Sequence, residues 1–131
     1  MYFRKSLIFL TMMALLLTLT SCTTVVPDSY ENGQAVFKYS DKDIQVTLSE
    51  EELAMVCDMF AGKELYMGNP SCGFTEDVAI KLDNKDTFCI ACDKCGIVFW
   101  KEQLRYFRLT DSENEQLRAM LESHGFRFPC I

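Results

Sequence analysis

The chain has 131 residues, and its 13 Lys and Arg against 19 Asp and Glu give a formal net charge of −6 at pH 7. This length fits one domain, and the acidic balance without a basic cluster argues against nucleic acid as a partner, because binding to a polyanion requires grouped Lys and Arg. The same charge disfavours adhesion of the domain to an anionic lipid surface.

The N-terminal segment has the pattern of an export signal. Arg4 and Lys5 precede an apolar stretch from Leu7 to Leu19 that is short for a membrane span. The stretch closes with Leu19-Thr20-Ser21-Cys22, which resembles the lipobox of bacterial lipoproteins. The resemblance covers this segment only. It implies cleavage before Cys22 and attachment of acyl chains such as palmitate, which would anchor the protein on the outer face of a bacterial membrane, in the cell envelope.

Three parts are therefore predicted along the chain: a signal peptide over 1–21, a lipidated tether over 22–34 and a single domain over 35–131. Pro27, Gly33 and the lack of a sustained hydrophobic period indicate the tether. Loss of the two basic residues of the signal would bring the net charge to about −8.

The first part of the domain predicts a hairpin followed by a helix. Apolar and polar residues alternate over 35–48 around a turn at 41–43. Ser49 and Glu52 then have the capping-box form of a helix start, and the helix should run to about residue 61 with Cys57 on its buried face. Residues 63–67 can form a short strand before a loop that contains Cys72.

The second part also leads from strands into a capped helix. A hairpin is predicted over 78–92, a central strand over 97–100 and another strand over 104–109. Thr110 and Glu113 form a second capping box, and the helix should end at Gly125. These elements predict an α+β domain, a mostly antiparallel sheet with two helices on one face. The repeated strand-to-helix unit is explained either by a degenerate duplication or by the general form of a capped helix after a strand.

Six cysteines remain when Cys22 is set aside, and an even number in a small exported domain indicates a disulfide framework. These disulfide candidates are Cys57, Cys72, Cys89, Cys92, Cys95 and Cys130. Six cysteines allow 15 pairings, so the sequence leaves the connectivity open. We expect Cys72 and Cys130 each to bond to a member of the cluster over 89–95, and Cys57 to take the third member.

The C-x-x-C-x-x-C spacing of Cys89, Cys92 and Cys95 also allows a metal site or a reactive thiol pair. The position at which bacterial ferredoxins carry a fourth cysteine holds Phe99. No helix is predicted directly after Cys92 to lower a thiol pKa. Structural bridges are therefore the preferred interpretation, and no cofactor or metal is predicted.

No group of residues in the sequence forms a complete catalytic set. His124 lies at a predicted helix end, where a cationic side chain favours the helix dipole. The carboxylates fall in turns and helix starts, which solvation and capping explain. The sequence therefore predicts a non-enzymatic envelope protein that binds another protein or a small ligand. The alternative is a thiol-based redox or metal-binding protein that uses Cys89, Cys92 and Cys95.

Overall fold

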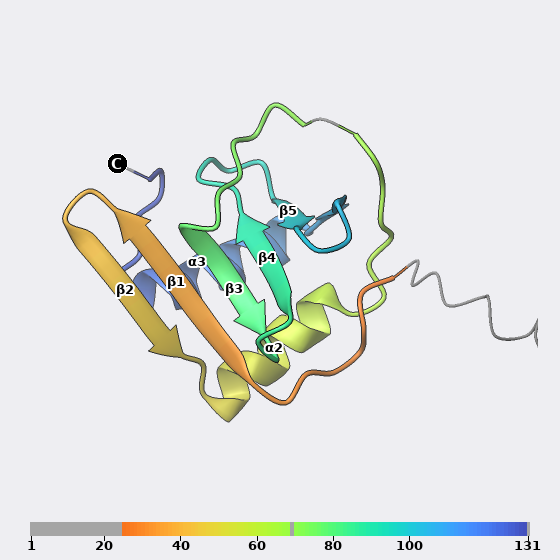
Figure 1. The fold of residues 1–131 in the computed structure, drawn as a ribbon, viewed down its shortest axis with the longest axis horizontal. Helices are drawn as coiled ribbons and strands as arrows, with labels where there is room; N and C mark the ends of the chain where they lie inside the picture. The colour runs from red at the N-terminus through yellow and green to blue at the C-terminus, as the bar shows by residue number, and fades with distance from the viewer. Residues whose placement is uncertain (1–24, 69, 131) are drawn as a thin grey trace, which may run out of the picture.

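The computed structural model describes residues 25–68 and 70–130 (Figure 1). The predicted signal peptide over 1–21 and the predicted lipidation site at Cys22 lie outside the described residues. Within this part of the chain, six strands form one antiparallel sheet, and both helices lie behind the sheet in the view of Figure 1. The predicted α+β class is confirmed. No helix in the described ranges has the length and apolar character needed to cross a membrane.

The strands follow the predicted hairpins closely and lie in the order β2-β1-β3-β4-β5-β6. Their bounds are β1 Gly33–Tyr39, β2 Lys42–Thr47, β3 Val78–Leu82, β4 Asp86–Ile90, β5 Ile97–Trp100 and β6 Arg105–Arg108. The register pairs Phe37 with Ile44 on one side and with Val78 on the other, so apolar residues meet on the same face across three strands.

Both helices begin at the predicted capping boxes. α2 Glu50–Phe60 follows Ser49, and α3 Asp111–Ser123 follows Thr110. In each box the hydroxyl of the cap residue accepts a hydrogen bond from the backbone N–H of the third helical residue, a glutamate. The carboxylate of this glutamate accepts in turn from the backbone N–H of the cap residue. Two backbone N–H groups that have no partner within the helix are thereby satisfied. α2 follows edge strand β2 and α3 follows edge strand β6, which places the two strand-to-helix units at opposite edges of the sheet.

The core lies between the sheet and the helices. Phe88 of β4 and Phe107 of β6 are fully buried and pack against Phe60 of α2, with ring centroids 5.2 and 5.1 Å apart. α3 adds Leu117 and Leu121, which are also fully buried. Each such side chain contributes about 1.5–3 kcal/mol by leaving water. This core fixes both helices on one face.

The other face of the sheet is partly covered by the loop between α2 and β3. Phe74 of this loop packs on Phe99 and Tyr106, at centroid distances of 5.8 and 5.5 Å. The short strand predicted over 63–67 is reduced to isolated bridges, Glu64 with Val25 and Tyr66 with Tyr106. The loop therefore continues the sheet beyond β6.

Packing begins before the predicted domain boundary at residue 35. Val26 is fully buried, Val25 pairs with Glu64, and the Tyr30 hydroxyl donates to Asp86 in the core. The sequence suggested a loose segment here because Pro27 and Gly33 interrupt its pattern. The structure instead packs this part of the predicted tether against the domain.

Candidate functional site

Two disulfides tie loops to the segment that follows β4. Cys92 bonds to Cys130, with their Cα atoms 5.2 Å apart, and Cys95 bonds to Cys72, with their Cα atoms 7.0 Å apart. Cys72 and Cys130 thus each reach the 89–95 cluster, as predicted. The first bridge fastens the C-terminal segment and the second fastens the loop before β3.

The expected third bridge between Cys57 and the cluster is absent, and Cys57 and Cys89 are free and buried. Cys57 lies on α2 among the helix-side core residues. Cys89 is the neighbour of helix-facing Phe88, and successive residues of a strand point to opposite faces, so the sheet separates the two thiols. Burial, aided by the charge of Glu102, raises the pKa of the Cys89 thiol to about 11. This thiol is protonated at neutral pH and is a poor nucleophile.

The three cysteines of the C-x-x-C-x-x-C motif have different environments. Cys89 is a buried thiol, while Cys92 and Cys95 belong to separate bridges. The group that the fold brings together is instead Cys72, Asp93 and Cys95, whose possible ligand atoms all lie within 4.8 Å of one another. The two sulfurs of this group are bonded to each other, so it could hold a metal only after reduction of that bridge.

A buried carboxylate joins β4 to β5 and to the N-terminal segment. Asp86 accepts hydrogen bonds from the Tyr30 hydroxyl and the Trp100 indole N–H, each at 3.0 Å. Burial, followed by the hydrogen bond and charge of Asp86, raises the pKa of Tyr30 well above its usual range. Each donor has a partner, so this network holds the core together.

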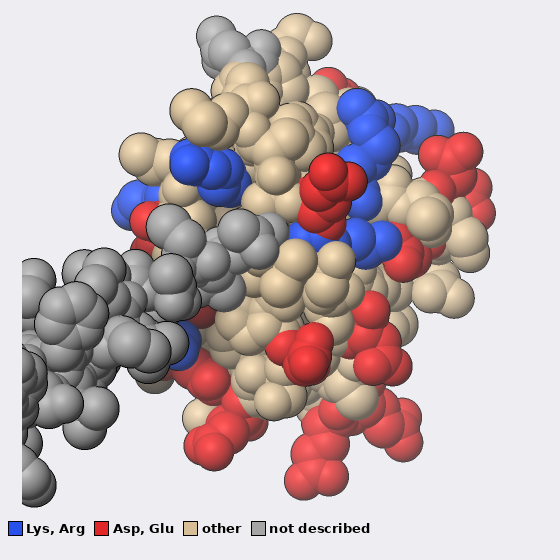
Figure 2. All heavy atoms as spheres, turned by 90° about the vertical axis from the view of Figure 1, so that its right-hand side faces the viewer, with Lys and Arg blue, Asp and Glu red and all other residues tan. Residues whose placement is uncertain are grey.

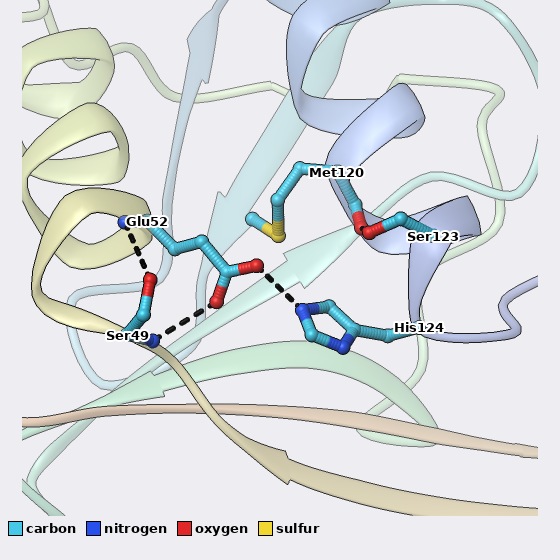
Figure 3. Close-up of polar contacts among 5 residues, drawn as sticks. All are labelled: Ser49, Glu52, Met120, Ser123 and His124. Atoms are coloured by element: carbon cyan, nitrogen blue, oxygen red, sulfur yellow. Dashed lines mark hydrogen bonds and ion pairs between the residues drawn. The ribbon is translucent and has the colours of Figure 1, made fainter.

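His124 and Glu52 connect the end of α3 to the start of α2 (Figure 3). The imidazole Nε2 lies 2.6 Å from Glu52 Oε1, while Oε2 accepts from the Ser49 amide. The Ser49 amide, and after it His124, outweigh partial burial and lower the pKa of Glu52. The neighbouring Ser123 hydroxyl donates to the Met120 carbonyl and not to His124. The pair therefore fastens two helix ends, and no serine–histidine–acid triad is built here.

A groove of about 560 Å³ runs between the two helices. It is lined by Glu51, Ala54, Met55, Asp58, Met59, Glu113 and Gln116. Met59 is buried and Met55 half-buried, so thioether side chains form an apolar floor, while Glu51 and Asp58 are exposed at the rim. These two rim carboxylates form no ion pair within the described residues.

Glu113, the third carboxylate of the groove, is already partnered. Lys63 lies 2.6 Å from its Oε2. Partial burial opposes its charged form, but the hydrogen bonds from Lys63 and from the Thr110 amide outweigh that effect and lower its pKa. The groove thus contains one neutralised carboxylate and two free ones.

The helical layer is strongly acidic. α2 carries Glu50, Glu51, Glu52 and Asp58 and no basic residue. The basic residue of α3, Arg118, is buried and bonded to the Asp93 carbonyl, with its guanidinium 4.4 Å from the centre of the Phe128 ring. On the face drawn in Figure 2, Asp and Glu prevail over the lower half and Lys and Arg gather in the upper half.

Comparison of the chain with protein-family models, with curated proteins and with solved structures finds no match.

Proposed function

We propose that the protein is a lipid-anchored, non-enzymatic envelope module that holds a basic segment of a partner protein in the groove between α2 and α3. The observation that carries this proposal is the composition of the groove, an apolar floor of Met55 and Met59 below the unpaired carboxylates of Glu51 and Asp58. A small apolar pocket would suit a neutral ligand, whereas this open, acid-rimmed groove suits a cationic one.

The two parts of the groove have separate roles in this proposal. Methionine side chains are unbranched and polarizable, so the floor can adapt to the apolar residues of a docked helix or extended segment. The free rim carboxylates attract Lys and Arg, which raises the rate of association and selects against acidic segments. Anchoring through Cys22 follows from the resemblance of Leu19-Thr20-Ser21-Cys22 to a lipobox and keeps this recognition at the membrane.

The proposal is tested by charge reversal at the rim. A photo-crosslinking residue at Ala54, inside the groove, should capture a specific partner on intact cells. The double substitution Glu51→Lys with Asp58→Lys should abolish the crosslinked product. The matched control is Glu115→Lys with Glu122→Lys, which makes the same charge change on exposed positions of α3 outside the groove and should leave the product intact. Equal loss in both variants, or no captured partner, contradicts the proposal.

A thiol-based function is the second candidate, and the grouping of Cys72, Asp93 and Cys95 favours it. In this alternative a dithiol reductant transfers two electrons and two protons to the Cys72–Cys95 bridge and becomes a disulfide itself. The two thiols then release their protons as their sulfurs bind a metal ion such as zinc together with the Asp93 carboxylate. Metal analysis of the reduced and reoxidised protein separates the candidates. One equivalent of zinc that disappears in Asp93→Asn would promote the alternative, and a metal-free reduced protein would exclude it.

A further inference from the structure

Three large apolar side chains stand out in the described part of the chain because they are exposed. Val25 is 43% exposed, Leu104 67% and Met67 74%. Scattered exposed apolar residues are ordinary on protein surfaces, whereas a group of them at one place marks a contact surface.

Backbone pairing brings all three to the edge of the sheet beyond β6. Tyr66 and Tyr106 exchange hydrogen bonds of 2.9 and 3.0 Å, and the bridge is antiparallel. Met67 follows Tyr66 and Leu104 precedes Tyr106 by two residues, so both lie toward the same end of that bridge. Val25 pairs with Glu64 of the same loop segment, so it lies at this edge as well, but toward the other end of the bridge.

Leu104 carries a second signal, from its backbone. Its φ of 51° lies in the left-handed region, which Gly, Asn and Asp adopt far more readily than leucine. The side chain is also excluded from the core. Neither the local turn nor the packing of the domain therefore favours a leucine at this position.

We propose that Val25, Met67 and Leu104 form an apolar edge that lies in the lipid headgroup interface. This inference rests on the proposed anchoring through Cys22. Val25 is three residue steps from Cys22, which span at most about 11 Å, so an acylated Cys22 would hold this edge close to the headgroups. A segment that was loose as far as residue 34 would have let the domain move away.

The charges near the edge indicate that apolar burial drives this contact. Lys101, in the turn that leads to Leu104, is paired with Glu76. Arg105 and the exposed Arg108 of β6 are the other cations close by, and the exposed carboxylates of Glu64 and Glu102 match them in number. Among these described residues the charges balance, so the contact of the edge with lipid should depend little on the anionic fraction of the bilayer.

The test uses the full-length chain, processed in cells and reconstituted in phosphatidylcholine vesicles that contain spin-labelled lipid. An environment-sensitive dye is attached after Leu104→Cys or Met67→Cys. Thr47→Cys is the matched control, because Thr47 is exposed on β2 at the opposite edge of the sheet. The lipid should quench the dye at positions 104 and 67 several-fold more than at 47, with a shift of emission to shorter wavelength. Addition of anionic lipid should leave this ratio unchanged.

Two further measurements keep the outcomes distinct. Leu104→Asn, in the chain labelled at position 67, should reduce quenching there while the domain stays folded, because asparagine tolerates the left-handed conformation. Mass spectrometry of the same sample reports acylation of Cys22. An acylated chain with equal quenching at 104 and 47 overturns the apolar edge alone, whereas a chain that is not acylated overturns the anchor.

Discussion

Removal of the Cys92–Cys130 bridge should destabilise the domain strongly. The bridge closes a loop with a sequence separation of 38 residues, and the chain-entropy relation gives about 4 kcal/mol for a loop of this size. The corresponding value for Cys72–Cys95, with a separation of 23, is about 3.4 kcal/mol. A domain of this size has a total stability of only about 5–15 kcal/mol. Loss of either bridge should therefore be evident in any unfolding experiment.

The variant for this test is Cys92→Ala with Cys130→Ala, and the matched control is Cys57→Ala with Cys89→Ala, which removes two buried sulfurs but no bridge. Guanidinium unfolding can be followed by fluorescence of Trp100, the single tryptophan, which is buried beside Asp86. We expect the free energy of unfolding to fall by about 4 kcal/mol in the bridge variant. In the control it should fall only by the smaller packing energy of the two side chains.

Thiol labelling supplies an independent check of the same assignment. Apart from Cys22, two thiols should react with a maleimide in the unfolded, unreduced protein, and neither should react quickly in the folded protein. A bridge variant that unfolds at the same guanidinium concentration as the control would refute the reasoning. So would a wild-type domain without free thiols, because Cys57 and Cys89 would then be bonded.

Three further outcomes are expected. Asp86→Ala should destabilise the domain by about 3 kcal/mol in denaturant unfolding, because it leaves the buried Tyr30 and Trp100 donors without an acceptor, whereas Tyr30→Phe, which removes only one donor, should cost about 1 kcal/mol. The lowered pKa values of Glu52 and Glu113 contribute stability above their unfolded value of about 4.3, and this stability is lost as the pH falls through the folded values. The melting temperature should thus drop on acidification below pH 5, and less steeply in Glu52→Gln with Glu113→Gln. Leu104→Gly should raise the unfolding free energy by about 1 kcal/mol, because glycine adopts positive φ without strain, and no gain would contradict the backbone argument.

The elements of the fold could be predicted because their signals are local. Alternation sets the hairpins, and the capping boxes at Ser49 and Thr110 start both helices where expected. Two bridges were also predictable, since Cys72 and Cys130 lie outside regular elements and can reach the 89–95 cluster. The large sequence separation within each pair did not prevent those predictions, because a cysteine in a loop has the conformational freedom to approach a distant partner.

The failed third bridge has a physical reason that lies partly in the sequence itself. Phe88 and Ile90 share one face of β4, which places Cys89 on the other face. Cys57 could bond to Cys89 only if α2 packed on that second face, and nothing local in the sequence indicates which face the helix covers.

Helix docking likewise determines two features of the helical layer. It pairs His124 with Glu52, 72 residues away, and it brings α2 and α3 together to form the groove. Tertiary contacts of this kind produce no periodic pattern in the sequence from which they could be predicted.

The early packing of Val25 and Val26 also sets how far the acidic residues of α2 lie from the proposed lipid anchor at Cys22. The amide of Gly62, just after α2, donates to the Val26 carbonyl at 3.2 Å, so the C-terminal end of α2 lies beside the segment nearest Cys22. α2 has 11 residues, and at 1.5 Å per residue its acidic first turn lies about 16 Å farther along the helix. This separation exceeds the Debye length of about 8 Å at physiological ionic strength. A domain held at its apolar edge can thus keep Glu50 and Glu51 beyond the range of lipid charge whenever the helix points away from the bilayer. The charge of this first turn, which is part of the net negative charge of the domain, therefore opposes contact through the edge only weakly, and it favours orientations in which the first turn of α2 points away from the lipid.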